Sequence, residues 1–311
     1  MTRVAAVDCG TNSIRLLIHD TEAGEVSRRN TIVRLGQGVD ETGAFAPEAI
    51  ERTRAALADY VEEMQREGVT RVRMVATSAT RDAANREDFF AMTRELLGRV
   101  QPGAVAEVIS GEEEARSTFQ AVRRWYGWSA GRITNLDIGG GSLELSTGTD
   151  EHPDLAFSLD LGAGRLTHNW FDTDPPEKKK VSALRDFIDA ELEDAVTQMK
   201  AMGPAGLAVG TSKTFRTLAR LTGSAPSSAG PYVKRTLTAP GLRQLISFIS
   251  RMTAADRADL EGVSSNRSHQ IVAGALVAEA SMRALDIEKL EICPWALREG
   301  VILRRTDKGL E

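Results

Sequence analysis

The chain has 311 residues, of which 41% are hydrophobic and 27% charged, and its net charge is −5. A negative balance argues against broad nucleic-acid binding, which normally needs a basic surface, although local basic clusters can still bind a polyanion. The sequence has no apolar run long enough to span a bilayer, no signal-peptide segment at its start, and no zinc spacing among its two cysteines and four histidines. The length predicts two domains, each with its own core, and we expect a cytoplasmic protein without membrane or nucleic-acid partners.

The first part of the chain alternates expected strands and helices. We expect strands at residues 3–8, 14–19, 26–35, 72–76 and 105–109, and a helix that begins at Pro47. Residues 77–81 leave one of these strands with hydroxyl groups and Arg81, and the carboxyl ends of strands are where open α/β sheets bind ligands. Arg81 is therefore a candidate phosphate contact, and the alternative is a surface salt bridge to Asp82 or Glu87.

A helix with an acidic first turn is expected after Ser110. Ser110 is a suitable N-cap, and the helix dipole stabilises carboxylates such as Glu112 and Glu113 in the first turn. We expect this helix to continue as far as Trp128. Beyond it we expect strands at 156–161, 206–210 and 290–292, a short helix after 162, helices at 181–199, 239–252, 266–285 and 294–303, and a surface loop at 222–231.

Two stretches share the layout of strand, Asp, glycine-containing turn and strand. They read DCGTNS from Asp8 and DIGGGSLE from Asp137, at a constant offset of 129 residues, which predicts an internal duplication. Glycine amides can approach a phosphate closely, and carboxylates beside such a loop are reasonable if a divalent cation sits between them and the phosphate. For one loop alone, a flexible hairpin would be an equally good interpretation, but two loops could clamp one phosphoryl group. The candidate phosphate contacts are Gly10, Thr11, Asn12, Ser13, Gly139, Gly140, Gly141 and Ser142, and the candidate metal ligands are Asp8, Asp137 and Glu144.

Five motifs carry a resemblance to a known family. They are DCGTNSIRLLI (8–18), ATSATRDAAN (76–85), VISGEEEAR (108–116), DIGGGSLEL (137–145) and ALREG (296–300). The paired loops resemble the phosphate motifs of the superfamily of acetate and sugar kinases, heat-shock chaperone ATPases and actin. Within it, the ordered set resembles the exopolyphosphatase/guanosine pentaphosphate phosphatase (Ppx/GppA) family. This implies an α/β fold of two ribonuclease H-like, actin-like ATPase domains, each a mixed sheet flanked by helices, at 1–117 and 118–311. The resemblance also implies an active-site cleft between the domains and a last helix (about 295–305) that packs back on the first.

The resemblance also implies a reaction. The family's catalytic carboxylate directly precedes an Ala-Arg pair, which makes it Glu114 in this chain. The implied activity is that of an exopolyphosphatase, in which a water activated by Glu114 attacks the terminal phosphorus of inorganic polyphosphate with the help of Mg²⁺ or Mn²⁺. Alternatives are a guanosine pentaphosphate phosphohydrolase, a non-catalytic polyphosphate or alarmone binder, and a nucleotide-dependent kinase or chaperone. A homodimer is also implied.

Basic residues in the second half are candidates for a groove that binds a long polyanion. They are Arg165, Lys213, Arg216 and Arg267, beside the clusters Lys178–Lys180 and Lys234-Arg235, for which a solvated surface patch is the alternative. Two positions depart from the family pattern. Lys213 stands where relatives often have glycine, and it could add a phosphate contact or crowd a nucleotide. His269 stands where the family tends to have an Asp, and we assign it no catalytic role.

Overall fold

The computed structural model describes residues 2–37, 43–81 and 83–307. The chain divides into two compact units, Met1–Ala121 with Leu297–Glu311, and Val122–Ala296. The C-terminal helix thus belongs with the first unit, and the change from one unit to the other falls within a helix. Across the described residues, every helix is too short or too polar to cross a membrane.

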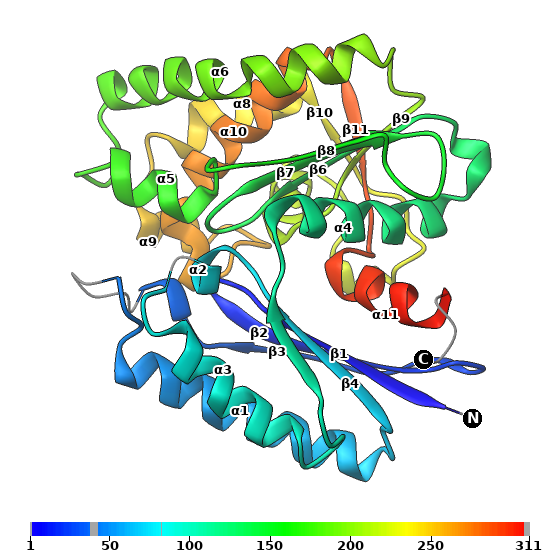
Figure 1. Cartoon of the computed structure of the whole chain (residues 1–311). Helices are drawn as coiled ribbons and strands as arrows, with labels where there is room; N and C mark the ends of the chain where they lie inside the picture. The colour runs from blue at the N-terminus through cyan, green and yellow to red at the C-terminus, as the bar shows by residue number, and fades with distance from the viewer. Residues whose placement is uncertain (1, 38–42, 82, 308–311) are drawn as a thin grey trace. The chain divides into compact units, whose positions relative to one another are not determined.

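The first unit is built on a mixed sheet with the strand order β3-β2-β1-β4-β5 (Figure 1). β1 pairs antiparallel with β2 and parallel with β4. Helices α1 and α3 cover one face of this sheet, and α11 packs against β1 and β2 on the other face. The elements are β1 (Arg3–Cys9), β2 (Ser13–Asp20), β3 (Gly24–Ile32), η1 (Leu35–Gln37), α1 (Pro47–Arg66), β4 (Arg71–Ala76), α2 (Ser78–Arg81), α3 (Arg86–Leu97), β5 (Val105–Val108), α4 (Gly111–Tyr126, which runs on into the second unit) and α11 (Leu297–Asp307).

Strand β1 shows why the sheet is covered on both faces. Alternate side chains of a strand point to opposite faces. Ala5 and Val7 therefore join the core formed with α1 and α3, whereas Val4 and Ala6 join the smaller core formed with α11. By the same alternation Asp8 lies on the α11 face, at the end of the strand. The sequence pattern thus places the first candidate carboxylate away from the main core of this unit.

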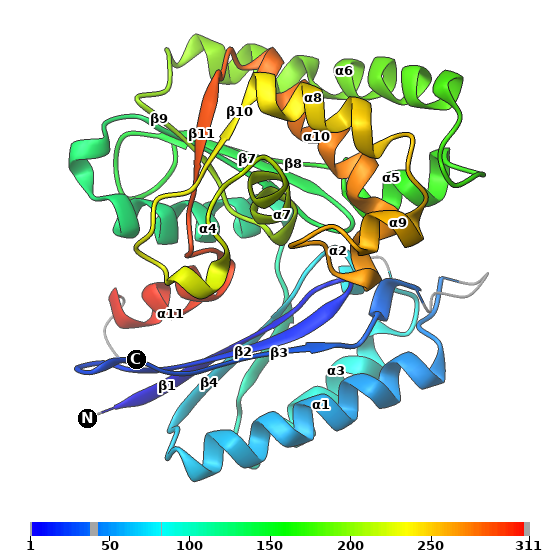
Figure 2. The same cartoon turned by 180° about the vertical axis from the view of Figure 1, so that it is seen from behind.

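The second unit repeats this arrangement. Its sheet has the order β10-β11-β9-β6-β7-β8, and read from β8 the strands β8-β7-β6-β9-β11 match β3-β2-β1-β4-β5 in order and direction. β10 is an additional edge strand, antiparallel to β11 (Figure 2). The elements are η2 (Trp128–Ala130), β6 (Ile133–Ile138), β7 (Leu143–Gly148), β8 (Leu155–Leu159), α5 (Ala163–Trp170), α6 (Lys178–Ala201), β9 (Leu207–Gly210), α7 (Lys213–Leu221), η3 (Ser227–Ala229), β10 (Thr236–Thr238), α8 (Ala239–Ile249), α9 (Ala254–Ala258), η4 (Ser265–Gln270), α10 (Ile271–Ala284) and β11 (Lys289–Ile292).

Helix α10 is the centre of the core of the second unit. Its residues from Ile271 to Met282 are all buried, and it packs against α5, α6 and α8. A helix that is apolar on all sides is stable only when it is enclosed by other elements. The same core holds Leu136 and Ile138 of β6, so Asp137, which lies between them in sequence, points to the other face of the sheet.

The structure differs from the expected elements in a few places. The helix expected to reach Trp128 ends at Tyr126, because Gly127 has a φ of +75° that a helix cannot continue through. The helix expected at 266–285 begins as the 3-10 helix η4 and becomes α-helical only at Ile271. Helix α3 and strand β10 were not expected. The periodicity of 266–285 does not separate a 3-10 turn from an α-helical one, and β10 is too short to give a pattern.

Asp20 fixes the turn that follows β2, and this gives a prediction about pH. Its Oδ1 accepts hydrogen bonds from the backbone N–H groups of Glu22 (3.0 Å) and Ala23 (3.1 Å), and Arg3 lies 3.5 Å from Oδ2. These backbone bonds, with a smaller contribution from Arg3, lower the pKa of Asp20 against the opposing effect of burial. Its stabilisation is therefore present above the ordinary carboxyl pKa and is lost as the pH falls through the lower, folded-state pKa.

We expect Asp20→Asn to be less stable than the wild type at neutral pH, with a difference that shrinks as the pH falls below about 4. Urea unfolding midpoints of both proteins over a pH series measure this. A difference that stays constant down to the acid limit would show that the charge of Asp20 contributes nothing.

Candidate active site

The two predicted glycine loops adopt the same turn. In the first, the N–H of Gly10 donates to the carbonyl of Ser13 at 3.0 Å, and in the second the N–H of Gly139 donates to the carbonyl of Ser142 at 2.9 Å. Each turn joins two antiparallel strands, β1 with β2 and β6 with β7. With the repeated strand order, this shared hydrogen bond shows that the two halves of the chain have the same local architecture.

Contacts with a neighbouring segment hold the first loop in place. The carbonyl of Asn12 accepts hydrogen bonds from the N–H groups of Val33 (3.1 Å) and Arg34 (3.0 Å), and the carbonyl of Thr11 accepts one from Gly36 (2.8 Å). The side chains of Asn12 and Ser13 are buried. The loop is therefore part of a fixed framework, as expected for a site that positions a ligand.

The second loop has its carbonyl groups directed to one side. The carbonyl of Gly139 accepts from the N–H of Ala163 (3.0 Å), and that of Gly140 accepts from Gly164 and Arg165 (2.9 Å each). The Arg165 Nε donates to the carbonyl of Gly141 at 2.9 Å. In a trans peptide the N–H points opposite to the C=O. The N–H groups of residues 140–142 are therefore directed away from α5, as in a backbone nest that binds anions.

The two candidate acids of the second loop lie opposite each other on β6 and β7. Asp137 and Glu144 are register partners, so their side chains share one face of the sheet. The Asp137 Oδ2 accepts from the Thr211 Oγ1 at 2.6 Å, and the Glu144 Oε1 accepts from the Ser158 Oγ at 2.9 Å. Glu144 is only 2% exposed. Two carboxylates directly opposite each other repel, and a cation beside them would remove this cost.

In the first loop, a basic residue stands in place of the second acid, so two carboxylates do not face each other. Arg15 is the register partner of Asp8, at the position equivalent to Glu144, and its Nη1 lies 3.2 Å from the Asp8 Oδ2. Asp8 is therefore paired with a cationic side chain of the protein. The acid pair Asp137 and Glu144 fits a divalent cation better, because it offers only oxygen ligands.

The described residues do not form a complete metal centre by themselves. Among the described residues, no three His, Cys, Asp or Glu side chains come together closely enough to bind a metal ion by themselves. Mg²⁺ commonly binds to one or two carboxylates and takes its other ligands from water and substrate phosphates. The pair Asp137 and Glu144 agrees with that mode.

Glu114 lies in the first turn of α4, in the first unit. Ser110 caps this helix as predicted, because its Oγ accepts from the N–H of Glu113 at 3.1 Å. The Glu114 Oε2 lies 3.9 Å from the Nη2 of Arg81, which also donates to the carbonyl of Ile109 at 3.2 Å. The structure thus brings Arg81 and Glu114 together.

The alternative interpretation of Arg81 was a surface salt bridge. Asp82 lies outside the described residues, and the ion pairs of Glu87 are with Arg86 and Arg94, not with Arg81. Glu112, in the same first turn as Glu114, is exposed.

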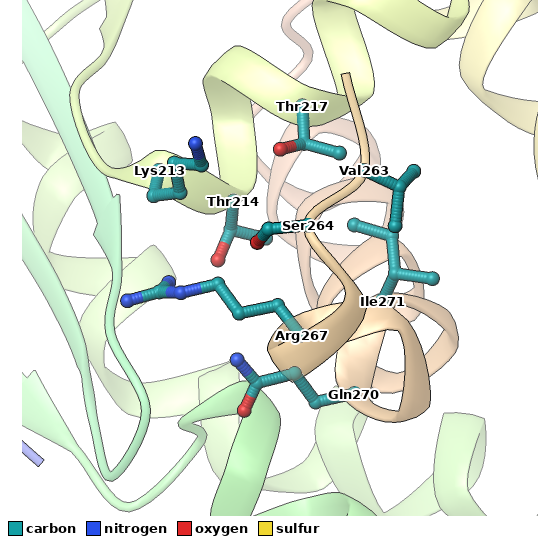
Figure 3. A pocket seen from close by; sticks show the side chains of 8 residues that line it. All are labelled: Lys213, Thr214, Thr217, Val263, Ser264, Arg267, Gln270 and Ile271. Carbon is teal, nitrogen blue, oxygen red and sulfur yellow. The ribbon is translucent and has the colours of Figure 1, made fainter. Parts of the chain in front are cut away.

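The candidate groove residues lie in three kinds of environment. Arg165 braces the second glycine loop through Gly141 and lies 3.5 Å from Asp160. Arg216 donates to the carbonyl groups of Cys293 (3.4 Å) and Pro294 (3.0 Å). Lys213 and Arg267 line a common pocket in the second unit (Figure 3).

Sequence reasoning missed Arg15, Thr211 and Ser158, the partners of the three candidate acids. Arg15 could have been predicted from the repeat, because it lies 129 residues before Glu144. Thr211 and Ser158 come from other strands or strand ends, and no local pattern points to them.

Comparison with known proteins shows the family to which the chain belongs. A model of the Ppx/GppA phosphatase family matches residues 17–309. Exopolyphosphatase 1 of Mycobacterium tuberculosis is 54% identical over 310 residues, which cover 98% of this chain and 88% of that protein. A Ppx/GppA enzyme of Aquifex aeolicus, of solved structure, is 30% identical with a TM-score of 0.82, covering 97% of this chain and 99% of that one.

A solved exopolyphosphatase structure from Cytophaga hutchinsonii has a TM-score of 0.87 at 23% identity, covering 100% of this chain and 99% of that one, and it supports the fold alone. The predicted fold class, two actin-like ATPase domains each with a mixed sheet flanked by helices, is confirmed. The motifs, the repeated sheet and these likenesses agree, and the chain belongs to the Ppx/GppA phosphatase family.

Proposed function

We propose that this protein is an exopolyphosphatase, which hydrolyses the terminal phosphoanhydride bond of inorganic polyphosphate and releases orthophosphate. The observation that carries the proposal is the 54% identity to Exopolyphosphatase 1 along nearly the whole chain. The two anion-binding loops and the carboxylate of Glu114 supply the groups that this reaction needs.

The reaction is an in-line displacement at the terminal phosphorus. Glu114 orients a water molecule and accepts one of its protons while the water oxygen forms a bond to phosphorus and the bridging P–O bond breaks. The electron pair of the broken bond stays on the shortened polyphosphate. Its phosphate oxygen is a weak base, with a pKa of about 6 by analogy with phosphate, so no general acid is required.

The glycine loops bind the oxygens of the phosphoryl group. The N–H groups of residues 140–142 already point to one side, so they stabilise the shifting negative charge without reorganisation. In the first unit, residues 10–13 and Arg81 are assigned the same role.

Asp137 and Glu144 would hold Mg²⁺ or Mn²⁺, which when bound neutralises charge on the phosphate oxygens. Asp8 was predicted as a further ligand, and it has Arg15 at 3.2 Å as its cation. Thr211 and Ser158 fix the orientation of the two acids through their hydroxyl groups.

Thr211→Val tests this orientation. Valine keeps the shape of the buried side chain but removes the hydrogen bond to Asp137, and a hydrogen bond to a charged group is worth about 1.5–3 kcal/mol. We expect kcat/KM for polyphosphate to fall about tenfold and the Mg²⁺ concentration for half-maximal rate to rise. Thr134→Val is the control, because it removes a buried hydroxyl from β6, the strand of Asp137, and this hydroxyl pairs with Thr147. If both variants show the same Mg²⁺ dependence, Thr211 has no role in metal binding.

Phosphate release from polyphosphate, guanosine pentaphosphate and ATP, each with Mg²⁺ or Mn²⁺, tests the proposed function itself. We expect polyphosphate to have the highest kcat/KM. Faster release from guanosine pentaphosphate would assign the protein to the other activity in the family's name. Saturable binding of polyphosphate without any release would identify a non-catalytic binding protein. Either result contradicts the proposal.

A further inference from the structure

Gly300, the fourth residue of α11, lies against the backbone of α4. Gly300 and Ser117 of α4 both belong to the first unit. A Cβ added to Gly300 would come 1.9 Å from the carbonyl oxygen of Ser117 and 2.6 Å from its carbonyl carbon, and real Cβ atoms do not come closer than 3.0 Å to other heavy atoms. The two helices can therefore lie this close only because residue 300 has no side chain. The ALREG motif ends at Gly300 and contributes no group to the proposed reaction.

Another side of α11 is packed against the sheet of the first unit. Its apolar residues form a small core with side chains of β1, β2 and β4 and with Ile109, and each member is at most 7% exposed. The members are Val4, Ala6, Leu17, Val75, Ile109, Leu297, Val301 and Ile302. Because protein interiors are close-packed, α11 has no free space on this side into which it could move away from α4.

The start of α4 is attached to the same core. Ile109, which directly precedes the N-cap residue of α4, is a member of it. The N–H of Ile109 donates to the carbonyl of Ala76 at 3.1 Å, and its carbonyl accepts from the Arg81 Nη2 at 3.2 Å. The first two turns of α4 are thus held at two points, at Ile109 and at the contact between Ser117 and Gly300.

Glu114 lies between these two points. It precedes Ser117 by three residues, so the two lie on the same side of α4, about one turn apart. The side chain of Glu114 is 17% exposed, and its Oε2 lies 3.9 Å from the Arg81 Nη2. A shift of the α4 backbone at Ser117 would therefore change the position of the Glu114 carboxylate relative to Arg81 within the first unit.

We propose that Gly300 is a positioning residue for phosphoanhydride hydrolysis. By allowing the backbones of α11 and α4 to touch, it fixes the point from which Glu114 orients and deprotonates the attacking water. This inference rests on the proposed function, because Gly300 acts only through Glu114. A catalytic group that is displaced by about 1 Å can lose about 10²-fold in rate, so the spacing of the two helices controls turnover.

Gly300→Ala tests this inference. We expect kcat for phosphate release from polyphosphate, measured per folded molecule, to fall about 10–100-fold, because the added Cβ displaces the first turns of α4. The KM for polyphosphate should stay within about twofold, because no group that binds the substrate is removed. Gly148→Ala is the matched control, because its added Cβ also meets backbone, 2.8 Å from the Cα of Pro153 in the second unit. This control should lower the melting temperature and keep kcat.

A double-mutant cycle with Glu114→Gln separates positioning from a general loss of structure. If Gly300 acts through Glu114, Gly300→Ala should lower kcat by no more than about twofold in the Glu114→Gln background. Losses that multiply in the double variant, or a wild-type kcat in folded Gly300→Ala, would overturn the inference and leave the proposed function intact. A wild type that releases no phosphate, or a Glu114→Gln variant as fast as the wild type, would instead contradict the proposed function itself.

Ile302→Phe takes the place of Gly300→Ala in this cycle if the alanine variant does not fold. Ile302 lies two residues beyond Gly300, or about 200° around the helix, so it points to the opposite side of α11. A larger side chain there overpacks the small core and moves α11 toward α4. We expect a loss of kcat of about three- to tenfold, which is likewise absent in the Glu114→Gln background. A wild-type kcat in folded Ile302→Phe would overturn the inference.

Discussion

Replacing Glu114 by Gln is expected to lower kcat for phosphate release from polyphosphate by about 10²–10⁴-fold, the usual contribution of a positioned general base. The amide keeps the size of the carboxylate but cannot accept the proton of the attacking water. Glu114 is half-buried and lies 3.9 Å from Arg81, so its carboxylate has a defined position in the structure. The substitution removes this one carboxylate. The rate is measured at saturating polyphosphate and Mg²⁺.

Glu112→Gln is the matched control for this experiment. Glu112 lies in the same first turn of α4 and is exposed. Its replacement therefore changes the net charge and the interaction with the helix dipole as much as the replacement of Glu114 does. We expect it to leave kcat within about twofold of the wild type, since exposed charges near a helix terminus are worth only about 0.3–1 kcal/mol. Equal rates in the wild type and Glu114→Gln would remove Glu114 from the mechanism, and equal losses in both variants would show a general effect of charge.

Gly162→Ala is expected to abolish most activity without touching any reacting group. The φ of Gly162 is −71°, which alanine adopts readily, so backbone strain is not the cause. An added Cβ would instead come closer than 3.0 Å to the backbone of Gly141 and Ser142, which real Cβ atoms do not do. The second glycine loop must therefore shift. A displacement of about 1 Å can cost about 10²-fold in rate, and overpacking costs about 1–3 kcal/mol of stability.

The control for Gly162→Ala is a second glycine with the same kind of steric conflict. A Cβ on Gly148, at the other end of β7, would come 2.8 Å from the Cα of Pro153 and 2.9 Å from the N of Asp154. Gly148→Ala should lower the melting temperature in the same way but keep the activity per folded molecule. Thermal unfolding and kcat measured on both variants make the comparison. Similar activity losses in both would show that the loop is not specifically disturbed.

The repeated features of the chain could be predicted from the sequence alone. The two loops, their flanking strands and the capping of α4 by Ser110 all depend on residues close in sequence, where the pattern of glycine, hydroxyl and apolar residues has a direct local meaning. The fold class followed from the same pattern together with the family resemblance, and the repeated sheet order confirms it.

Partners far apart in the sequence were beyond prediction. Thr211 reaches Asp137 across 74 residues, and Gln270 reaches the segment of Gly164 only because η4 and α5 pack together. The charge of an arginine also does not tell where its guanidinium points. Arg165 and Arg216 were predicted for a polyanion groove, and both donate to main-chain carbonyl groups. Side-chain direction depends on tertiary packing, which a single sequence does not encode in any local pattern.

The pairing of Asp8 with Arg15 and of Asp137 with Glu144 has an evolutionary consequence. A half-length ancestor that worked as a symmetric dimer would have carried one residue type at both of these positions. Two copies within one chain can differ at equivalent positions, and here one pair is Asp8 with Arg15 and the other is Asp137 with Glu144. The first copy places a basic residue opposite its acid, whereas the second places two acids opposite each other. The repeated fold of this chain therefore carries two different electrostatic arrangements, which two identical subunits could not provide.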